Sequence, residues 1–155
     1  MAQLSLQSGA DWFQYALSEI TAGQWWRLIT GNLIHLNWQH FAMNASALIV
    51  MLILLPDSLK LGELFSVFLL CSLSVTLALW AFHPSIYWYV GLSGALHGVL
   101  VVLLLLDIVA HKNSWSVILC MLLMAKLAWE GLMGPLPGSE ATAGGPVVVL
   151  SLIHI

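Results

Sequence analysis

A serine flanked by glycines opens one of the apolar segments of this chain, in the sequence GLSGALHG at 91–98. Two polar residues, His40 and Asn44, begin an earlier apolar segment and share one helical face, because they are one turn apart. His154 lies within the last apolar segment. The hydroxyl of Ser93, an imidazole base and two side chains that donate hydrogen bonds to an oxyanion are the groups that serine-catalysed acyl transfer requires.

The glycines around this serine also favour a purely structural interpretation. Gly94 and Gly98 are four positions apart, a spacing that lets membrane helices approach each other closely. The two interpretations are compatible, because close approach also brings a base on a second helix within reach of the serine hydroxyl.

Two histidines compete for the role of base. His97 lies four residues after Ser93 on the same helix face, but helical side chains point toward the N-terminus, so an aligned hydrogen bond is not assured. His154 is expected a few residues into a helix that descends from the same side of the membrane, at a depth comparable with Ser93. We therefore predict that His154 is the base and that His97 has a supporting role.

Three further polar residues lie in or beside apolar segments. His35 is five residues from His40, which predicts a different helical face and a structural role. Lys126 and Glu130 are one turn apart in a spanning segment, where ionisable residues suggest a function. They form either a mutually neutralising pair or, in a transporter, a proton relay. A Ser–Lys dyad is a further alternative, but Lys126 is expected about mid-membrane, several residues deeper than Ser93.

The composition predicts an integral membrane protein. Hydrophobic residues make up 61% of the chain and charged residues 7%, far below the roughly 25% charged residues of soluble domains. Cys71 and Cys120 lie in apolar segments and form no metal motif, and no basic patch suggests nucleic acid. The expected fold is an all-α, polytopic bundle of membrane helices without a metal or organic cofactor.

Four apolar stretches approach the ~20 residues that cross a bilayer, and a fifth is partial. They are 33–55, 61–82, 91–106, 115–133 and 146–155. We predict an extracytoplasmic, interfacial stretch at 1–32 followed by a transmembrane domain at 33–155. The sequence is expected to be the core of a six-helix protein, without its first helix and the end of its last.

The lysines of two loops predict the orientation. Lys60 follows the first span and Lys112 the third, whereas the loops 83–89 and 134–145 contain no Lys or Arg. The positive-inside rule then places the Lys60 and Lys112 loops in the cytoplasm. Ser93 accordingly faces the extracytoplasmic side.

In the order of these motifs, the chain resembles the rhomboid intramembrane serine proteases. The matching residues are Trp26-Arg27, His35, His40-Phe41-Ala42-Met43-Asn44, Gly91-Leu92-Ser93-Gly94 and His154. The resemblance extends from about Gly23 to the end of the sequence. It implies a Ser93–His154 dyad, with His40, Asn44 and the Ser93 backbone N–H as the oxyanion hole.

The GLSGALHG motif and the short loops are similar to those of the rhombosortase branch, in which His97 replaces an aromatic residue beside the base. This resemblance implies an enzyme of the cell inner membrane. Its substrates would be single-spanning exported proteins with a small-residue, Gly-rich C-terminal anchor, cleaved near those small residues. The alternatives are an inactive fragment and a non-catalytic rhomboid-like protein that binds single-spanning partners.

Overall fold

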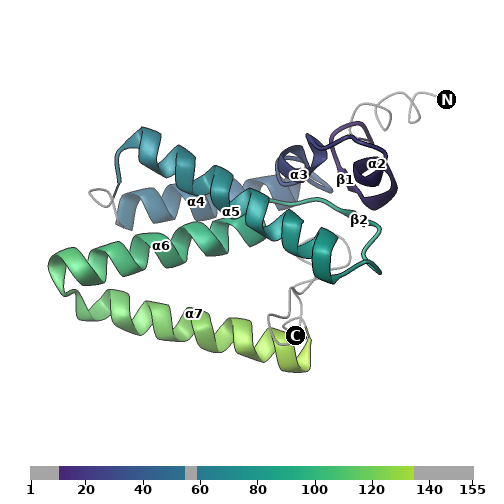
Figure 1. Cartoon of the computed structure of the whole chain (residues 1–155). Helices are drawn as coiled ribbons and strands as arrows, with labels where there is room; N and C mark the ends of the chain where they lie inside the picture. The colour runs from purple at the N-terminus through teal and green to yellow at the C-terminus, as the bar shows by residue number, and fades with distance from the viewer. Residues whose placement is uncertain (1–10, 55–58, 135–155) are drawn as a thin grey trace.

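The computed structural model describes residues 11–54 and 59–134, most of which are helical (Figure 1). The elements are β1 (Tyr15–Ala16), α2 (Leu17–Thr21), α3 (Arg27–Thr30), α4 (Trp38–Leu54), α5 (Leu61–Phe82), β2 (Trp88–Tyr89), α6 (Ser93–His111) and α7 (Ser114–Met133). Helices α4 to α7 form a bundle, and the short elements gather at one end of it. The predicted all-α membrane helix bundle is confirmed, and the described residues add to it one pair of two-residue strands.

Three of the four predicted spans are long and apolar enough to cross a membrane, namely α5, α6 and α7. The fourth, α4, has 17 residues and begins at Trp38 instead of the predicted Leu33. Its start is fixed by Asn37, whose Oδ1 accepts a hydrogen bond from the backbone N–H of His40 at 2.8 Å. Asparagine is a preferred residue at this capping position.

The predicted end of the third span at Leu106 is wrong, because α6 continues to His111. The reason is the environment of Asp107, whose carboxylate accepts hydrogen bonds from the Ser116 hydroxyl and from His111 Nδ1. A carboxylate with two partners can remain within a helix that packs on its neighbour. The helix ends at Lys112, which has the left-handed φ of 52°.

One face of α4 packs along α6. Met51 on α4 lies in an apolar cluster with Leu96, Val99 and Leu103 of α6, and Ala47 packs on the same cluster. These positions share a helical face with Asn44, one turn before Ala47 and Leu48, and with His40, two turns before them. The apolar contact therefore directs the two polar residues toward the start of α6.

The segment before α4 forms a compact unit at the end of the bundle. Tyr15, Ile20 and Leu28 are buried against Leu79 of α5 and against Tyr89. Strand β1 pairs with β2 in antiparallel fashion, with Tyr15 opposite Tyr89. This unit is thus tied both to a spanning helix and to the strand that leads into α6.

Two buried polar side chains of this unit, Arg27 and Asn32, donate hydrogen bonds to backbone carbonyls. Arg27 is buried, and its Nη1 donates to the carbonyls of Asp11 at 2.6 Å and Gln14 at 2.8 Å. Asn32 Nδ2 donates to the carbonyl of Ser72 on α5 at 3.2 Å. These bonds fix the unit against α5.

The two glycines predicted to allow close helix packing both face α5. A Cβ atom added at Gly94 would lie 3.2 Å from Val75 Cγ1, and one added at Gly98 would lie 2.8 Å from Cys71 Sγ. The second distance is shorter than ordinary carbon–sulfur contacts. The packing interpretation of Gly94 and Gly98 is therefore correct, and it is what holds α6 against α5.

Gly98→Ala is expected to destabilise the protein by about 1–3 kcal/mol, the usual cost of overpacking. The added methyl group meets Cys71 Sγ, so Cys71→Ala in the same chain should recover part of the loss. Thermal unfolding in mild detergent measures both effects. Gly62→Ala is the control, since nothing lies within 4 Å of a Cβ at that position. Equal losses at Gly98 and Gly62 would contradict this packing.

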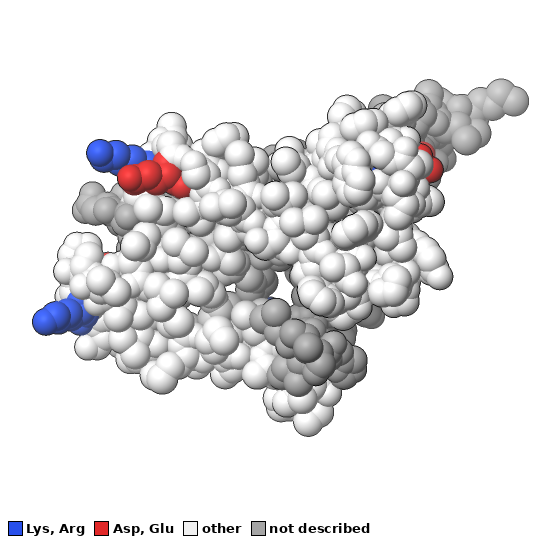
Figure 2. Space-filling view, viewed as in Figure 1, with Lys and Arg blue, Asp and Glu red and all other residues white. Residues whose placement is uncertain are grey.

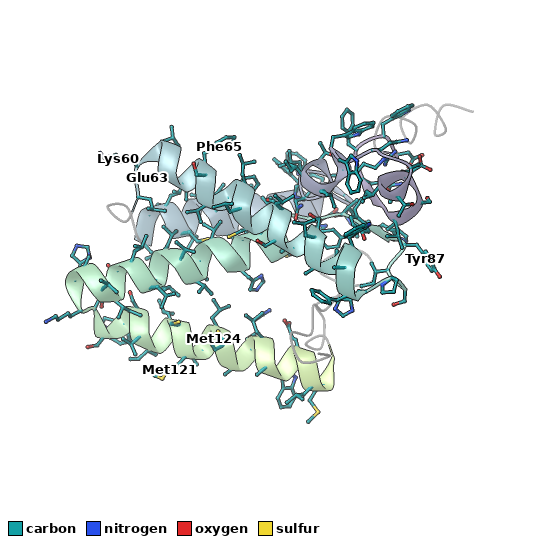
Figure 3. All side chains as sticks on the ribbon, in the orientation of Figure 1. Lys60, Glu63, Phe65, Tyr87, Met121 and Met124 are labelled. Carbon is teal, nitrogen blue, oxygen red and sulfur yellow. The ribbon has the colours of Figure 1, made fainter. Side chains whose placement is uncertain are left out.

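The surface has the polarity of a membrane protein. Figure 2 shows a mostly uncharged surface, with the visible charges gathered at the two ends of the molecule. Phe65 on α5 and Met121 on α7 are exposed and point away from the bundle on opposite sides (Figure 3). Lys60 lies at the end of the bundle where α6 turns into α7, and Lys112 is in that turn. The two lysine-containing loops that predict the orientation therefore lie at the same end of the helix bundle.

Candidate active site

Ser93 is the first residue of α6, and its side chain is exposed at the mouth of the bundle. The turn before it requires Gly91, whose φ of 129° is rarely adopted by residues with a side chain. Gly91 N–H donates to the carbonyl of Gly31 at 3.2 Å, which anchors this turn on the N-terminal unit. Because the first N–H groups of a helix have no partner within it, the start of α6 also offers donors beside the serine.

Tyr89 organises this turn, a role that the sequence analysis missed. Its hydroxyl donates to the carbonyl of Gly91 at 2.8 Å and also hydrogen-bonds with the Ser93 side chain and the Gly94 backbone. Burial raises the pKa of Tyr89 to about 12, so the phenol keeps its proton and remains a donor at neutral pH. The only sequence feature that could indicate this role is the position of the tyrosine four residues before the serine. Helical spacing does not apply to this pair, because Tyr89 lies in β2 and Ser93 begins α6.

Tyr89→Phe is expected to lower the free energy of unfolding by about 1 kcal/mol, the net value of a typical buried hydrogen bond. It should also slow the reaction of Ser93 with a fluorophosphonate probe, because the turn that carries Ser93 loses its anchor. Thermal unfolding and probe labelling measure the two effects. Tyr87→Phe, which alters an exposed tyrosine in the same connection, is the control. Equal labelling of both variants would contradict the role of the Tyr89 hydroxyl.

His40 and Asn44 are buried on the α4 face that packs along α6. A Cβ added at Gly91 would lie 2.9 Å from His40 Cε1 and 3.3 Å from Nε2, so the imidazole lies directly against the Gly91 backbone. His40 Nδ1 and Asn44 Nδ2 are buried without a hydrogen-bond partner among the described residues. Such groups are uncommon in folded proteins and require an explanation. Here they lie on the helix that flanks the turn of Ser93.

The structure corrects the prediction for His35. It lies before α4 rather than on a second face of that helix, and its ring centroid is 5.2 Å from that of His40 in an edge-on contact. His35 also packs edge-on against Phe41, at 5.3 Å, and its Nδ1 lies 3.1 Å from the Leu33 carbonyl oxygen. A structural role in holding His40 is consistent with these contacts.

Both ring nitrogens of His97 are engaged, which leaves neither of them for the Ser93 hydroxyl. Its Nδ1 lies 2.7 Å from the Ser93 carbonyl oxygen, and its Nε2 lies 3.3 Å from Lys126 Nζ. These contacts weigh against His97 as the base. Lys126 is opposite His97, one turn into α6, and therefore lies closer to the level of Ser93 than predicted.

His154, the predicted base, lies outside the described residues. Within residues 11–54 and 59–134, no group of three or more His, Cys, Asp or Glu side chains could hold a metal ion. The described part of the site therefore consists of a serine at a helix start, a glycine turn and the side chains of His35, His40 and Asn44, each with one buried nitrogen that has no hydrogen-bond partner among the described residues.

The apolar helices and this polar site define an integral membrane protein of the helix-bundle class. A family model, the Rhomboid domain, matches residues 22–150. The chain belongs to the rhomboid family, whose members are generally serine proteases that act within membranes. No curated protein and no solved structure matches the chain.

Proposed function

We propose that this protein is an intramembrane serine endopeptidase that works with a Ser93–His154 dyad. The observation that supports it best is the pair of buried, unpartnered atoms on α4, His40 Nδ1 and Asn44 Nδ2, on a helix whose His40 ring lies against Gly91. Buried donors without a partner in the resting protein are suited to an oxygen that becomes charged only during the reaction. The family supports the same chemistry.

In the proposed reaction, the Ser93 oxygen attacks the scissile carbonyl carbon while His154 takes the hydroxyl proton. The resulting oxyanion accepts hydrogen bonds from His40, Asn44 and the Ser93 backbone N–H. The carbon–nitrogen bond then breaks, the amine leaves with the proton from His154, and an acyl-enzyme remains. Water hydrolyses this ester with His154 again as the base, which regenerates the serine.

The substrates we propose are single-spanning proteins with a small-residue, Gly-rich C-terminal anchor, as in the rhombosortase branch. Small and helix-breaking residues suit such a site because the substrate helix must unwind before its backbone reaches Ser93. We further propose the cell inner membrane as the location, with the site on the extracytoplasmic side. The shared end of Lys60 and Lys112 supports this orientation.

The test is cleavage of a single-spanning reporter in liposomes that contain the purified protein. The reporter carries a Gly-rich anchor, and a matched reporter carries leucines in place of the glycines. Cleavage of the first reporter that requires both Ser93 and His154 supports the proposal. Binding of the reporter without any Ser93-dependent cleavage would instead favour the non-catalytic alternative.

A further inference from the structure

Lys126 and Glu130 form a charged pair within α7 that the proposed reaction does not use. Lys126 Nζ lies 2.7 Å from Glu130 Oε2, and the Glu130 side chain is only 13% exposed. Ionisable groups in spanning helices are costly, and they usually face a polar partner or a functional site. Here the partner is His97 on α6, whose Nε2 lies 3.3 Å from Lys126 Nζ.

Two polar contacts fix the register between α6 and α7, which run antiparallel from the turn at Lys112. Near this turn, the Ser116 hydroxyl donates to Asp107. Ten residues farther along each helix, His97 and Lys126 are again in contact. Both helices rise by about 1.5 Å per residue, so one turn beyond that contact Ser93 and Glu130 lie at the same level. The charged pair therefore reaches the depth of the nucleophile.

The contacts of Lys126 also determine the tautomer of His97. An ammonium group has only donors, so Nε2 of the imidazole must accept the bond from Lys126. A neutral imidazole that accepts at Nε2 carries its proton on Nδ1. That nitrogen lies 2.7 Å from the carbonyl oxygen of Ser93, which can only accept. Donation thus runs from Lys126 through His97 to the backbone of Ser93, while Glu130 accepts a second bond from Lys126.

We propose that Glu130, Lys126 and His97 are positioning residues that hold the first turn of α6, and with it Ser93, in its reactive place. This inference rests on the proposed protease function. It differs from a structural role in which the two charges merely neutralise each other. If the role is only structural, removing both charges together leaves the activity unchanged. If the proposed role holds, the same change removes the donor that sets the tautomer of His97, so Ser93 is held less well and its reactivity falls.

The experiment removes both charges in one variant of the full chain, Lys126→Met with Glu130→Gln. A single substitution would leave the other, partly buried charge without its partner and could destabilise the fold, whereas removing both is often close to neutral for stability. Fluorophosphonate labelling of Ser93 is then measured over a range of probe concentrations. We expect the rate at saturating probe to fall between about tenfold and a hundredfold, the range caused by small misplacements of reacting groups. The half-saturating concentration should stay nearly unchanged.

Two matched variants complete the labelling experiment. Lys126→Arg keeps a charged donor opposite His97 and should retain most of the rate. Lys112→Met removes an exposed lysine at the other end of α6 and should leave labelling unchanged. A wild-type labelling rate in the double variant would overturn the positioning role.

A second readout reports the tautomer directly, through ¹⁵N NMR of the chain labelled in its histidines. The His97 signals are assigned by their loss in His97→Gln. The proposal expects a proton on Nδ1 in the wild type and a mixture of tautomers in the double variant. A proton on Nε2 in the wild type would overturn the proposal even if the double variant did not fold. Absence of Ser93-dependent labelling in the wild type would instead overturn the protease function, so the two failures are distinguishable.

Discussion

Ser93→Ala is expected to abolish both cleavage of the reporter and labelling by a fluorophosphonate, because no other group in the site would form the acyl-enzyme. The remaining rate should be at least about 10⁴-fold below the wild type, as in serine hydrolases that lose their nucleophile. Ser93 is exposed, so the free energy of unfolding should change by less than about 1 kcal/mol. Reporter cleavage in liposomes and thermal unfolding measure the two quantities.

The matched control for this variant is Ser66→Ala. Ser66 is an exposed serine of α5 whose hydroxyl donates to the carbonyl of Gly62 within the same helix. It should keep the wild-type rate of cleavage. Cleavage by the Ser93→Ala protein at the rate of the control would eliminate the mechanism.

His40→Ala and Asn44→Ala are each expected to lower kcat by about 10²–10³-fold, the usual effect of losing one donor to an oxyanion. KM should change little, because the donors act on the charge that develops after the substrate has bound. Steady-state cleavage of the reporter separates the two constants. His40 Nδ1 and Asn44 Nδ2 have no hydrogen-bond partner within the described residues, so removing either donor breaks no hydrogen bond of that nitrogen in the resting protein.

The same experiment distinguishes an oxyanion hole from a packing role on α4. Asn44→Leu keeps much of the side-chain volume without its donors and should be as slow as Asn44→Ala. Gln39→Ala removes an exposed amide from the same helix and should keep the wild-type rate. Recovery of activity in Asn44→Leu would show that Asn44 serves only to fill space.

The sequence predicts the parts of the fold that depend on uninterrupted apolar character. Helix α5 spans Leu61–Phe82, as predicted, and its start is closed by a local contact in which Glu63 accepts a hydrogen bond from the backbone N–H of Lys60. The end of α6 was predicted wrongly because one of the two partners of Asp107, Ser116, lies on another helix. Local patterns contain no information about such a partner.

The candidate site shows the same limit. The spacing of His40 and Asn44 predicts their common face, and the structure places both on the buried side of α4. The contact of His35 with His40 and the bonds of Tyr89 depend on turns whose path the sequence does not determine. The reach of Lys126 to His97 depends on the register of two helices. The role of His154 stays a prediction.

Through Tyr89, the turn that carries Ser93 depends on the packing of the N-terminal unit. Tyr15 pairs with Tyr89 across the two strands, and the Tyr89 ring lies in the apolar core of the N-terminal unit. Substitutions that loosen this unit are therefore expected to displace the Tyr89 hydroxyl from the Gly91 carbonyl in the turn before Ser93. Under the proposed function, such changes are expected to slow the labelling of Ser93 before they unfold the helix bundle.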